Sequence, residues 1–317
     1  MIWIDAETVA KSYPVSECIE TMEDLYRNEG TTQISQPSRS VLKVDDDSVI
    51  LTMQGYSPRL RRFGVKLVTE YKSNPKKYSL PVQGGTLILL DTENSTVLAN
   101  VDAPAITAIR TGAVSGLATK YLAKSECEKL GLIGTGQQAR TMLKAVLSVR
   151  KGIKIVQVYS RNRENVERFS KEMTQEIGLN IEGVSSNEAV LKEVDIINVA
   201  TNSATPVLRW KDVPRGAHIN SIGTLAERTE LDLDTVSNST LFVDTRNGVL
   251  KDAGDVISAI GSGRITKDKI KGDLSDLVNR KVSGREDDSE VTLFKSVGTA
   301  LQDVYASSWI YEKISKS

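Results

Sequence analysis

The stretch KLGLIGTGQQARTMLKAVLSV, residues 129–149, decides the fold of this chain. A short apolar run leads into a turn in which Gly134, Gly136 and Ala139 follow the pattern G-x-G-x-x-A, and a segment with helical periodicity comes next. In such a strand-turn-helix unit the first glycine makes the tight turn and the second lets the backbone approach a pyrophosphate. The small third residue lets helix and strand pack closely, and the helix N-terminus faces the phosphates. The stretch therefore predicts a dinucleotide-binding turn.

Strand-like and helix-like segments alternate from Leu130 onward. This alternation predicts right-handed crossovers and a mostly parallel sheet. Strands are expected within LGLIG, IVQVYS, NIEGVSS, DIINVAT, AHINSIG and STLFVDT, and helices within QARTMLKAVLSV, RENVERFSKEMTQEI and NEAVLKEV. The fold class is therefore α/β, with a Rossmann dinucleotide-binding domain over residues 125–294.

The rest of the chain has a different pattern. It predicts a helix near residues 15–28, strands in SRSVLKV, SVILTMQGY, FGVKLVTEY and GGTLILLD, and a long small-residue helix in APAITAIRTGAVSGLATKYLAKS. A final helix is expected in TLFKSVGTALQDVYASSWIYEKI. That helix either caps the nucleotide domain or returns to the first domain. We prefer the return, because a large apolar helix needs a face to bury. Residues 1–124 and 295–317 then form one discontinuous α/β domain.

The residues after the second Rossmann strand bear on the choice of dinucleotide. An acidic residue there would bind the free ribose 2′-hydroxyl of NAD. This chain has Ser160, Arg161, Asn162 and Arg163, whose hydroxyl, amide and one or two guanidiniums suit a 2′-phosphate through charge-assisted hydrogen bonds. Alternatively, these residues are only the solvated start of a helix, since Ser and Asn are common caps. We expect NADP(H) to be preferred, with NAD(H) possible.

Composition excludes several classes of function. The 41 basic and 41 acidic residues balance, which argues against nucleic acid or another partner bound mainly through phosphate charge. No apolar run is long enough for a membrane span, and the N-terminus does not resemble a signal peptide. The two cysteines lie far apart and no Cys/His cluster has metal-ligand spacing, so we expect no metal site and a cytoplasmic setting.

Several motifs occur in an order that resembles the ornithine cyclodeaminase/mu-crystallin family. They are QPSR, KLVTEY, AITAIRTGAVSGLATKYLA, LIGTGQQA, HINSIG followed by ELD, GRED and TLFKSVGTALQD. The resemblance implies a discontinuous substrate and dimerisation domain, a Rossmann domain and a homodimer. It also implies activity on amino or imino acids: ornithine cyclodeamination, alanine dehydrogenation or reduction of ketimines.

The same resemblance implies the site residues. It places Arg39, Lys66 and Arg110 around a substrate carboxylate and Val297 against the substrate. Most basic residues are solvated surface charges, but Arg110 interrupts a run of small apolar residues. Against the cofactor, with Arg110 and the turn glycines Gly134 and Gly136, it places Thr86, Gln137, Gln138, Ser160, Arg161, Asn162, Thr201, Gly223 and Ser296.

Two departures from the family pattern bear on the reaction. Cyclodeaminases and archaeal-type alanine dehydrogenases carry an aspartate just after the strand equivalent to INSIG, where this chain has Thr224 and Leu225. The carboxylate that binds the second ammonium of a diamine falls near Leu51, which cannot pair with an ammonium. These departures disfavour ornithine cyclodeamination.

We therefore predict NADP(H)-dependent reduction of a carboxylated ketimine, because a protonated imine needs no base before hydride transfer. Lys66 is the expected acid, since Arg39 and Arg110 should lower its pKa; Glu227 and Glu230 are alternatives, although Glu230 could be structural. Other hypotheses are an alanine dehydrogenase and a mu-crystallin-like ligand-binding protein with little turnover. The single histidine, His218, is expected to begin a buried strand rather than to act in catalysis.

Overall fold

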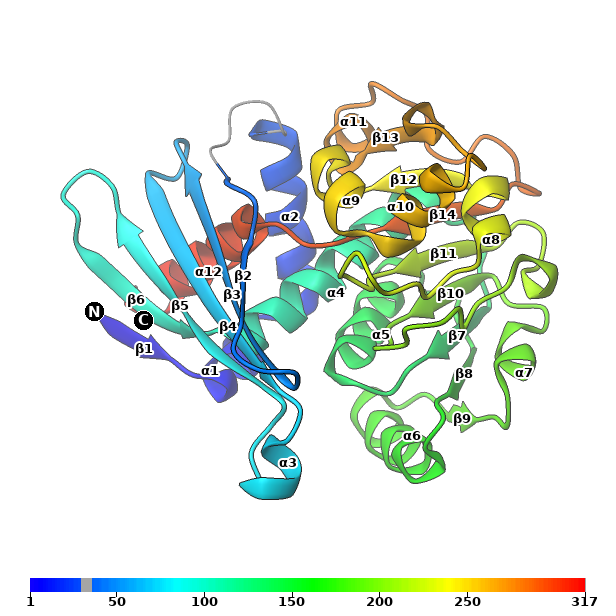
Figure 1. The fold of residues 1–317 in the computed structure, drawn as a ribbon, viewed down its shortest axis with the longest axis horizontal. Helices are drawn as coiled ribbons and strands as arrows, with labels where there is room; N and C mark the ends of the chain where they lie inside the picture. The colour runs from blue at the N-terminus through cyan, green and yellow to red at the C-terminus, as the bar shows by residue number, and fades with distance from the viewer. Residues whose placement is uncertain (30–35, 317) are drawn as a thin grey trace. The chain divides into compact units, whose positions relative to one another are not determined.

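The computed structural model describes residues 1–29 and 36–316. The chain divides into two compact units. Unit 1 comprises Met1–Arg110 and Thr299–Ser317, and unit 2 comprises Thr111–Gly298. In Figure 1, unit 1 runs from blue to cyan and includes the red helix α12, while unit 2 runs from green to orange. The division falls within helix α4 (Ala103–Leu122). The functional domain boundaries expected at residues 124 and 295 remain a prediction.

Unit 1 contains a six-stranded sheet in the order β1-β6-β5-β4-β3-β2. Strand β1 pairs with β6 in parallel, and the remaining neighbours are antiparallel. The strands are β1 (Ile2–Ile4), β2 (Ser40–Lys43), β3 (Ser48–Ser57), β4 (Arg62–Tyr71), β5 (Gln83–Asp91) and β6 (Val97–Asp102). The strands predicted at β2 to β5 are confirmed, whereas β1 and β6 were not predicted.

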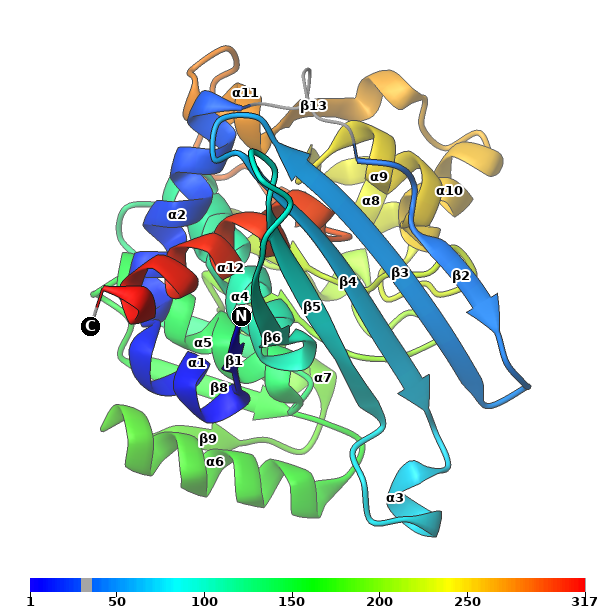
Figure 2. The same ribbon diagram turned by 90° about the vertical axis from the view of Figure 1, so that its left-hand side faces the viewer.

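One face of this sheet packs on α12 (Ala300–Ser315), which also contacts α2 (Val15–Asn28), as Figure 2 shows. Small residues allow the close approach: a Cβ on Gly64 would lie 2.8 Å from Val304, and one on Gly55 3.0 Å from Ala300. The predicted return of the final helix to the N-terminal unit is confirmed. The other helices of unit 1 are α1 (Ala6–Ser12) and α3 (Asn74–Lys77).

The start of that final helix was predicted wrongly. Residues Thr292–Lys295 form strand β14, which is fully buried between β11 and β12 in the sheet of unit 2. Gly298 then takes a φ of 76°, and the helix begins only after Thr299. The Thr299 side chain caps α12 in a capping box with Gln302. Pairing with β11 and β12 therefore makes the β-branched and aromatic segment Thr292–Lys295 a strand, although the sequence runs on directly toward the helix.

Unit 2 contains an eight-stranded, wholly parallel sheet in the order β13-β12-β14-β11-β10-β7-β8-β9. The strands before β14 are β7 (Lys129–Ile133), β8 (Ile155–Tyr159), β9 (Ile181–Gly183), β10 (Ile196–Val199), β11 (His218–Ser221), β12 (Thr240–Val243) and β13 (Ile270–Asp273). The helices are α5 (Gln137–Val149), α6 (Arg163–Ile177), α7 (Asn187–Leu191), α8 (Leu233–Asn238), α9 (Arg246–Asp252), α10 (Gly254–Gly261) and α11 (Leu274–Val278). The predicted Rossmann-like alternation is confirmed, with β13 and α8 to α11 added.

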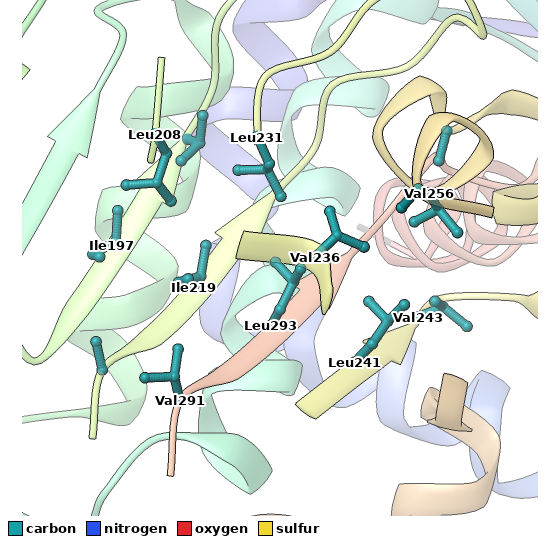
Figure 3. Close-up of a cluster of buried hydrophobic side chains, with 14 of the residues drawn as sticks. Ile197, Leu208, Ile219, Leu231, Val236, Leu241, Val243, Val256, Val291 and Leu293 are labelled. Atoms are coloured by element: carbon teal, nitrogen blue, oxygen red, sulfur yellow. The ribbon is translucent and has the colours of Figure 1, made fainter. Parts of the chain in front are cut away.

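Branched aliphatic side chains fill the core on one side of this sheet. Figure 3 shows Ile197, Ile219, Leu293 and Leu241 from adjacent strands in one cluster, with Val256 of α10 packed among them. Burying apolar side chains on adjacent parallel strands fixes the sheet and thus the positions of the loops at its carboxyl edge. Within the described ranges, no helix is both long and apolar enough to cross a membrane.

Candidate active site

The turn between β7 and α5 has the geometry that a dinucleotide requires. Gly134 has a φ of 115°, and a Cβ there would lie 2.1 Å from the carbonyl oxygen of Ala200. At Gly136 a Cβ would meet nothing within 4 Å, so the backbone is open to a ligand. Gly136 is also the N-cap of α5 and makes no side-chain capping bond, so nothing from a cap covers the first N–H groups of that helix. These residues fit a pyrophosphate.

The cofactor residues predicted in unit 2 gather at one edge of its sheet. Because all strands run in parallel, the segments that follow them emerge at the same carboxyl edge. The adjacent strands β7 and β10 form the switch point where such sheets bind ligands. The predicted residues follow β7 (Gly134, Gly136, Gln137 and Gln138), β8 (Ser160, Arg161 and Asn162), β10 (Thr201), β11 (Gly223) and β14 (Ser296).

Two buried carboxylates, Glu230 and Asp244, hold these segments in place. This role was not predicted from the sequence. Glu230, 1% exposed, accepts a hydrogen bond of 2.7 Å from the N–H of Thr201, and a Cβ on Gly223 would lie 2.3 Å from its Oε2. Asp244 accepts hydrogen bonds from the Ser296 hydroxyl at 2.8 Å and the Val297 N–H at 3.0 Å. Burial raises the pKa of both carboxyl groups. The structural interpretation of Glu230 is thus favoured over an acid.

The segment after β8 forms the N-terminus of α6. Asn162 caps α6, because its side chain accepts a hydrogen bond of 3.0 Å from the N–H of Asn165. Arg163 pairs on the surface with Glu167 at 3.0 Å. Arg161 is exposed and lies directly beyond the strand end. Arg161 therefore stays the candidate for a ribose phosphate, whereas Asn162 has a capping role.

Unit 1 contains a buried cluster of charges. The Lys66 ammonium lies 2.6 Å from Asp303 Oδ2, and Arg110 Nε donates to Asp303 Oδ1 at 2.9 Å. Lys66 also donates to the Thr107 hydroxyl at 3.1 Å. Lys66, Arg110 and Asp303 are 2%, 5% and 0% exposed, respectively. Two of the three predicted carboxylate-binding residues are thus brought together in unit 1.

Burial lowers the pKa of Lys66 to about 8. Asp303 opposes that change, and the positive charges of Arg110 and Arg39 add to it. The predicted direction is confirmed, but desolvation rather than the arginines is its main cause. Asp303 was not predicted from the sequence. Its signal was a carboxylate inside the apolar helix ALQDVYASSWI, where an unpaired charge is rarely buried.

The register of the sheet places the remaining unit 1 residues. Extending the β2–β3 pairing by one residue sets Arg39 opposite Met53, which pairs with Lys66. Leu51 pairs with Val68, two residues along β4, so Leu51 shares the face of Lys66. Thr86 pairs with Leu67 and therefore lies on the opposite face, where its hydroxyl donates to Asn100. The structure does not bring Thr86 to the charge cluster.

The turn that replaces the family aspartate is held by backbone hydrogen bonds. Leu225 has a φ of 94°, rare for a leucine, and its N–H donates to the carbonyl of Asp252 at 3.0 Å. Glu227 is exposed. His218 begins β11 as predicted and is fully buried, and burial lowers its pKa to about 3. Across residues 1–29 and 36–316, no group of metal-ligating side chains that could hold an ion is found.

Comparison with known proteins gives consistent matches along the chain. The model of the ornithine cyclodeaminase/mu-crystallin family matches residues 3–317. The chain is 31% identical over 316 residues to the Delta(1)-pyrroline-2-carboxylate reductase of Bacillus cereus (strain ATCC 10987 / NRS 248), which covers 99% of this chain and 96% of that protein.

Two solved structures are similar over nearly their whole length. The first is Thermococcus litoralis Delta(1)-pyrroline-2-carboxylate reductase in complex with NADH and L-proline, at a TM-score of 0.95 and 36% identity, covering 100% of this chain and 98% of that one. The second is an archaeal alanine dehydrogenase dimer with bound NAD, at a TM-score of 0.91 and 27% identity, covering 99% and 96%.

Proposed function

Because the chain belongs to the ornithine cyclodeaminase/mu-crystallin family, we propose that it reduces a carboxylated ketimine to an amino acid with a nicotinamide dinucleotide. The observation that carries this proposal is the buried Lys66–Asp303–Arg110 cluster. It offers cations for a carboxylate and a lysine whose pKa is near neutral. Two similar proteins are reductases of Delta(1)-pyrroline-2-carboxylate, a cyclic ketimine of this class.

Carboxylate binding follows from the charges in the cluster. Asp303 neutralises one positive charge, so Lys66 and Arg110 together keep one in excess. A buried positive charge is costly unless an anion pairs with it. Arg110 bonds Asp303 and Gln302 through Nε and Nη1, and neither bond uses Nη2. That nitrogen is the donor we assign to the substrate carboxylate.

Proton delivery is assigned to Lys66. When bound, a reduced nicotinamide supplies a hydride to the imine carbon. Lys66 Nζ gives its proton to the imine nitrogen, which makes the C=N carbon electrophilic, and as hydride reaches that carbon the π electrons of the C=N bond become the lone pair of the amine nitrogen. A lysine of pKa about 8 keeps its proton at neutral pH and still releases it readily. The neutral lysine regains its proton from water.

The substrate side chain is proposed to be apolar. Leu51 and Val68 form a pair on the same face of the sheet as Lys66. An aliphatic pair provides no partner for a second ammonium, and an unpaired buried ammonium is strongly disfavoured. This arrangement favours a cyclic or aliphatic imino acid over an imine derived from a diamine.

An alanine dehydrogenase is the second candidate, favoured by the similarity to the archaeal enzyme. Oxidising an amino acid requires a base that removes the ammonium proton before hydride leaves. Thr224 and Leu225 stand where the family aspartate is expected, and Glu227 is exposed. These residues favour the reductive reaction.

A substrate screen tests the proposal. Cyclic ketimine acids, and oxo acids mixed with ammonia or amines, are incubated with the protein while the absorbance of NADPH is followed. We expect carboxylated cyclic imines to be reduced fastest and matched imines without a carboxylate to be poor substrates. No turnover of any carboxylated imine would overturn the proposal.

For the cofactor, we expect NADPH to bind more tightly than NADH. A charged hydrogen bond from Arg161 to a 2′-phosphate is worth about 1.5 to 3 kcal/mol, or roughly ten- to a hundredfold. Titration of both cofactors into the apoprotein measures the preference, and Arg161→Ala should abolish it. Arg163→Ala is the matched control, because Arg163 is also exposed but pairs with Glu167. Equal affinities for the two cofactors in the unaltered protein would contradict this assignment.

For assembly, we propose a homodimer that covers the face of the unit 1 sheet opposite α12. Leu67 and Ile88 are 41% and 37% exposed on neighbouring strands of that sheet, and Leu42, which pairs with Ile50 on the same face, is 62% exposed on its edge strand. Apolar faces of this kind usually mark interfaces. Light scattering at micromolar concentration should give twice the 34.7 kDa of one chain. A monomer mass would refute the dimer, and Leu67→Glu should shift a dimer toward monomer.

A further inference from the structure

Asp303 contacts both candidate substrate-binding cations at once. Its Oδ2 lies 2.6 Å from the Lys66 ammonium, while its Oδ1 accepts the Nε hydrogen of Arg110 at 2.9 Å. We propose that Asp303 is a positioning residue for imine reduction, which fixes the ammonium and the guanidinium relative to each other through its two carboxylate oxygens. This inference rests on the proposed function and adds a residue to it.

The backbone that carries Asp303 is itself held in place. Asp303 lies in the first turn of α12, directly after Gln302 of the capping box. Gln302 Oε1 accepts from Arg110 Nη1 at 2.8 Å, and its Nε2 donates to the Tyr26 hydroxyl at 2.7 Å. Adjacent residues of one helix turn therefore hold the Nε–Nη1 edge of the guanidinium. Protein contacts therefore orient Nη2 of Arg110 before the substrate binds.

The charges around Lys66 come from three elements. Arg110 and the uncharged Thr107 lie on α4, Asp303 lies on α12, and Arg39 precedes β2. Near Arg110, Cys18 of α2 is uncharged, because burial raises the pKa of its thiol to about 12. Asp303 thus supplies the negative charge that opposes two arginines and desolvation. Neutralising it should let Lys66 lose its proton at lower pH.

The first experiment measures the pH dependence of imine reduction in Asp303→Asn, which keeps the shape and removes the charge. The rate of the unaltered enzyme should fall as pH rises through about 8. In the variant this fall should move down by about one pH unit or more, with KM raised roughly tenfold or more. Asp91→Asn is the matched control, since Asp91 also pairs with an arginine in unit 1, Arg62, at 2.8 Å. An unshifted profile in Asp303→Asn would overturn the proposal.

A second measurement does not depend on turnover. The ¹³C signal of the Lys66 ε-carbon, assigned by its loss in Lys66→Met, is titrated with pH in both proteins. We expect an apparent pKa near 8 in the unaltered protein and a lower one in Asp303→Asn. If Lys66 titrated identically in the two proteins, the influence of Asp303 on Lys66 would be refuted, whether or not any imine is reduced. If Asp303→Asn fails to fold, Asp303→Glu decides: it should keep the pH profile and raise KM, and a shifted profile would contradict the role of the charge.

Discussion

Lys66→Met lowers kcat for imine reduction by about 10²- to 10⁴-fold, the usual contribution of a general acid. Methionine fills a similar volume but carries no proton, so the imine nitrogen must take its proton from water. Substrate affinity should change much less, because Arg110 and Arg39 still provide positive charge for the carboxylate. Steady-state kinetics at saturating cofactor separate the two effects, since lost proton transfer lowers kcat whereas lost binding raises KM.

The pH dependence gives a second readout of the same residue. Lys66 has a pKa of about 8, below the ordinary 10.5 of a lysine, and it acts as an acid only while protonated. Activity should therefore be present below pH 8 and fall as pH rises through that value. In Lys66→Met this fall should disappear. Lys72→Met, an exposed lysine directly after β4, is the control that leaves rate and profile unchanged. Intact turnover in Lys66→Met would remove Lys66 from the mechanism.

Arg110→Ala should chiefly weaken capture of the substrate carboxylate. Losing a charged hydrogen bond costs about 1.5 to 3 kcal/mol, which raises KM roughly ten- to a hundredfold. The same change leaves Asp303 and Gln302 without their guanidinium, so the free energy of unfolding should also fall. Steady-state kinetics and thermal unfolding measure the two effects on one preparation.

Arg110→Lys separates charge from geometry. A lysine keeps the positive charge but cannot present the fork that bonds Asp303 and Gln302 together. We therefore expect a KM between those of Arg110→Ala and the unaltered enzyme. An unchanged KM in Arg110→Ala would show that the carboxylate is bound elsewhere.

The fold of unit 2 was predictable because its signals are local. The β7–α5 turn needs glycine at Gly134, where φ is 115°, and strands β7 to β12 and helices α5 to α7 follow local sequence patterns. Strand β14 was missed because Thr292–Lys295 continues directly toward a long helix, and only pairing with β11 and β12 makes it a strand. The short β6 was missed because Asn100 interrupts its apolar pattern.

The site was predictable only in part. Resemblance to the family indicated Lys66 and Arg110, but not Asp303, which bonds Arg110 across 193 residues of sequence. No periodicity reports such a contact. The cause of the Lys66 pKa was also misjudged, because burial depends on how α12 covers the sheet. Leu225 could be recognised as a departure from the family, whereas its φ of 94° could not.

The most direct test of imine reduction compares two rates in one preparation. One is the reduction of Δ1-pyrroline-2-carboxylate with NADPH, and the other is the oxidation of alanine with NADP, both at neutral pH. The cluster of Lys66, Asp303 and Arg110, with Leu225 in place of an aspartate base, predicts that the imine is reduced much faster than alanine is oxidised. Faster oxidation of alanine, with turnover intact in Lys66→Met, would contradict this account and establish the dehydrogenase instead.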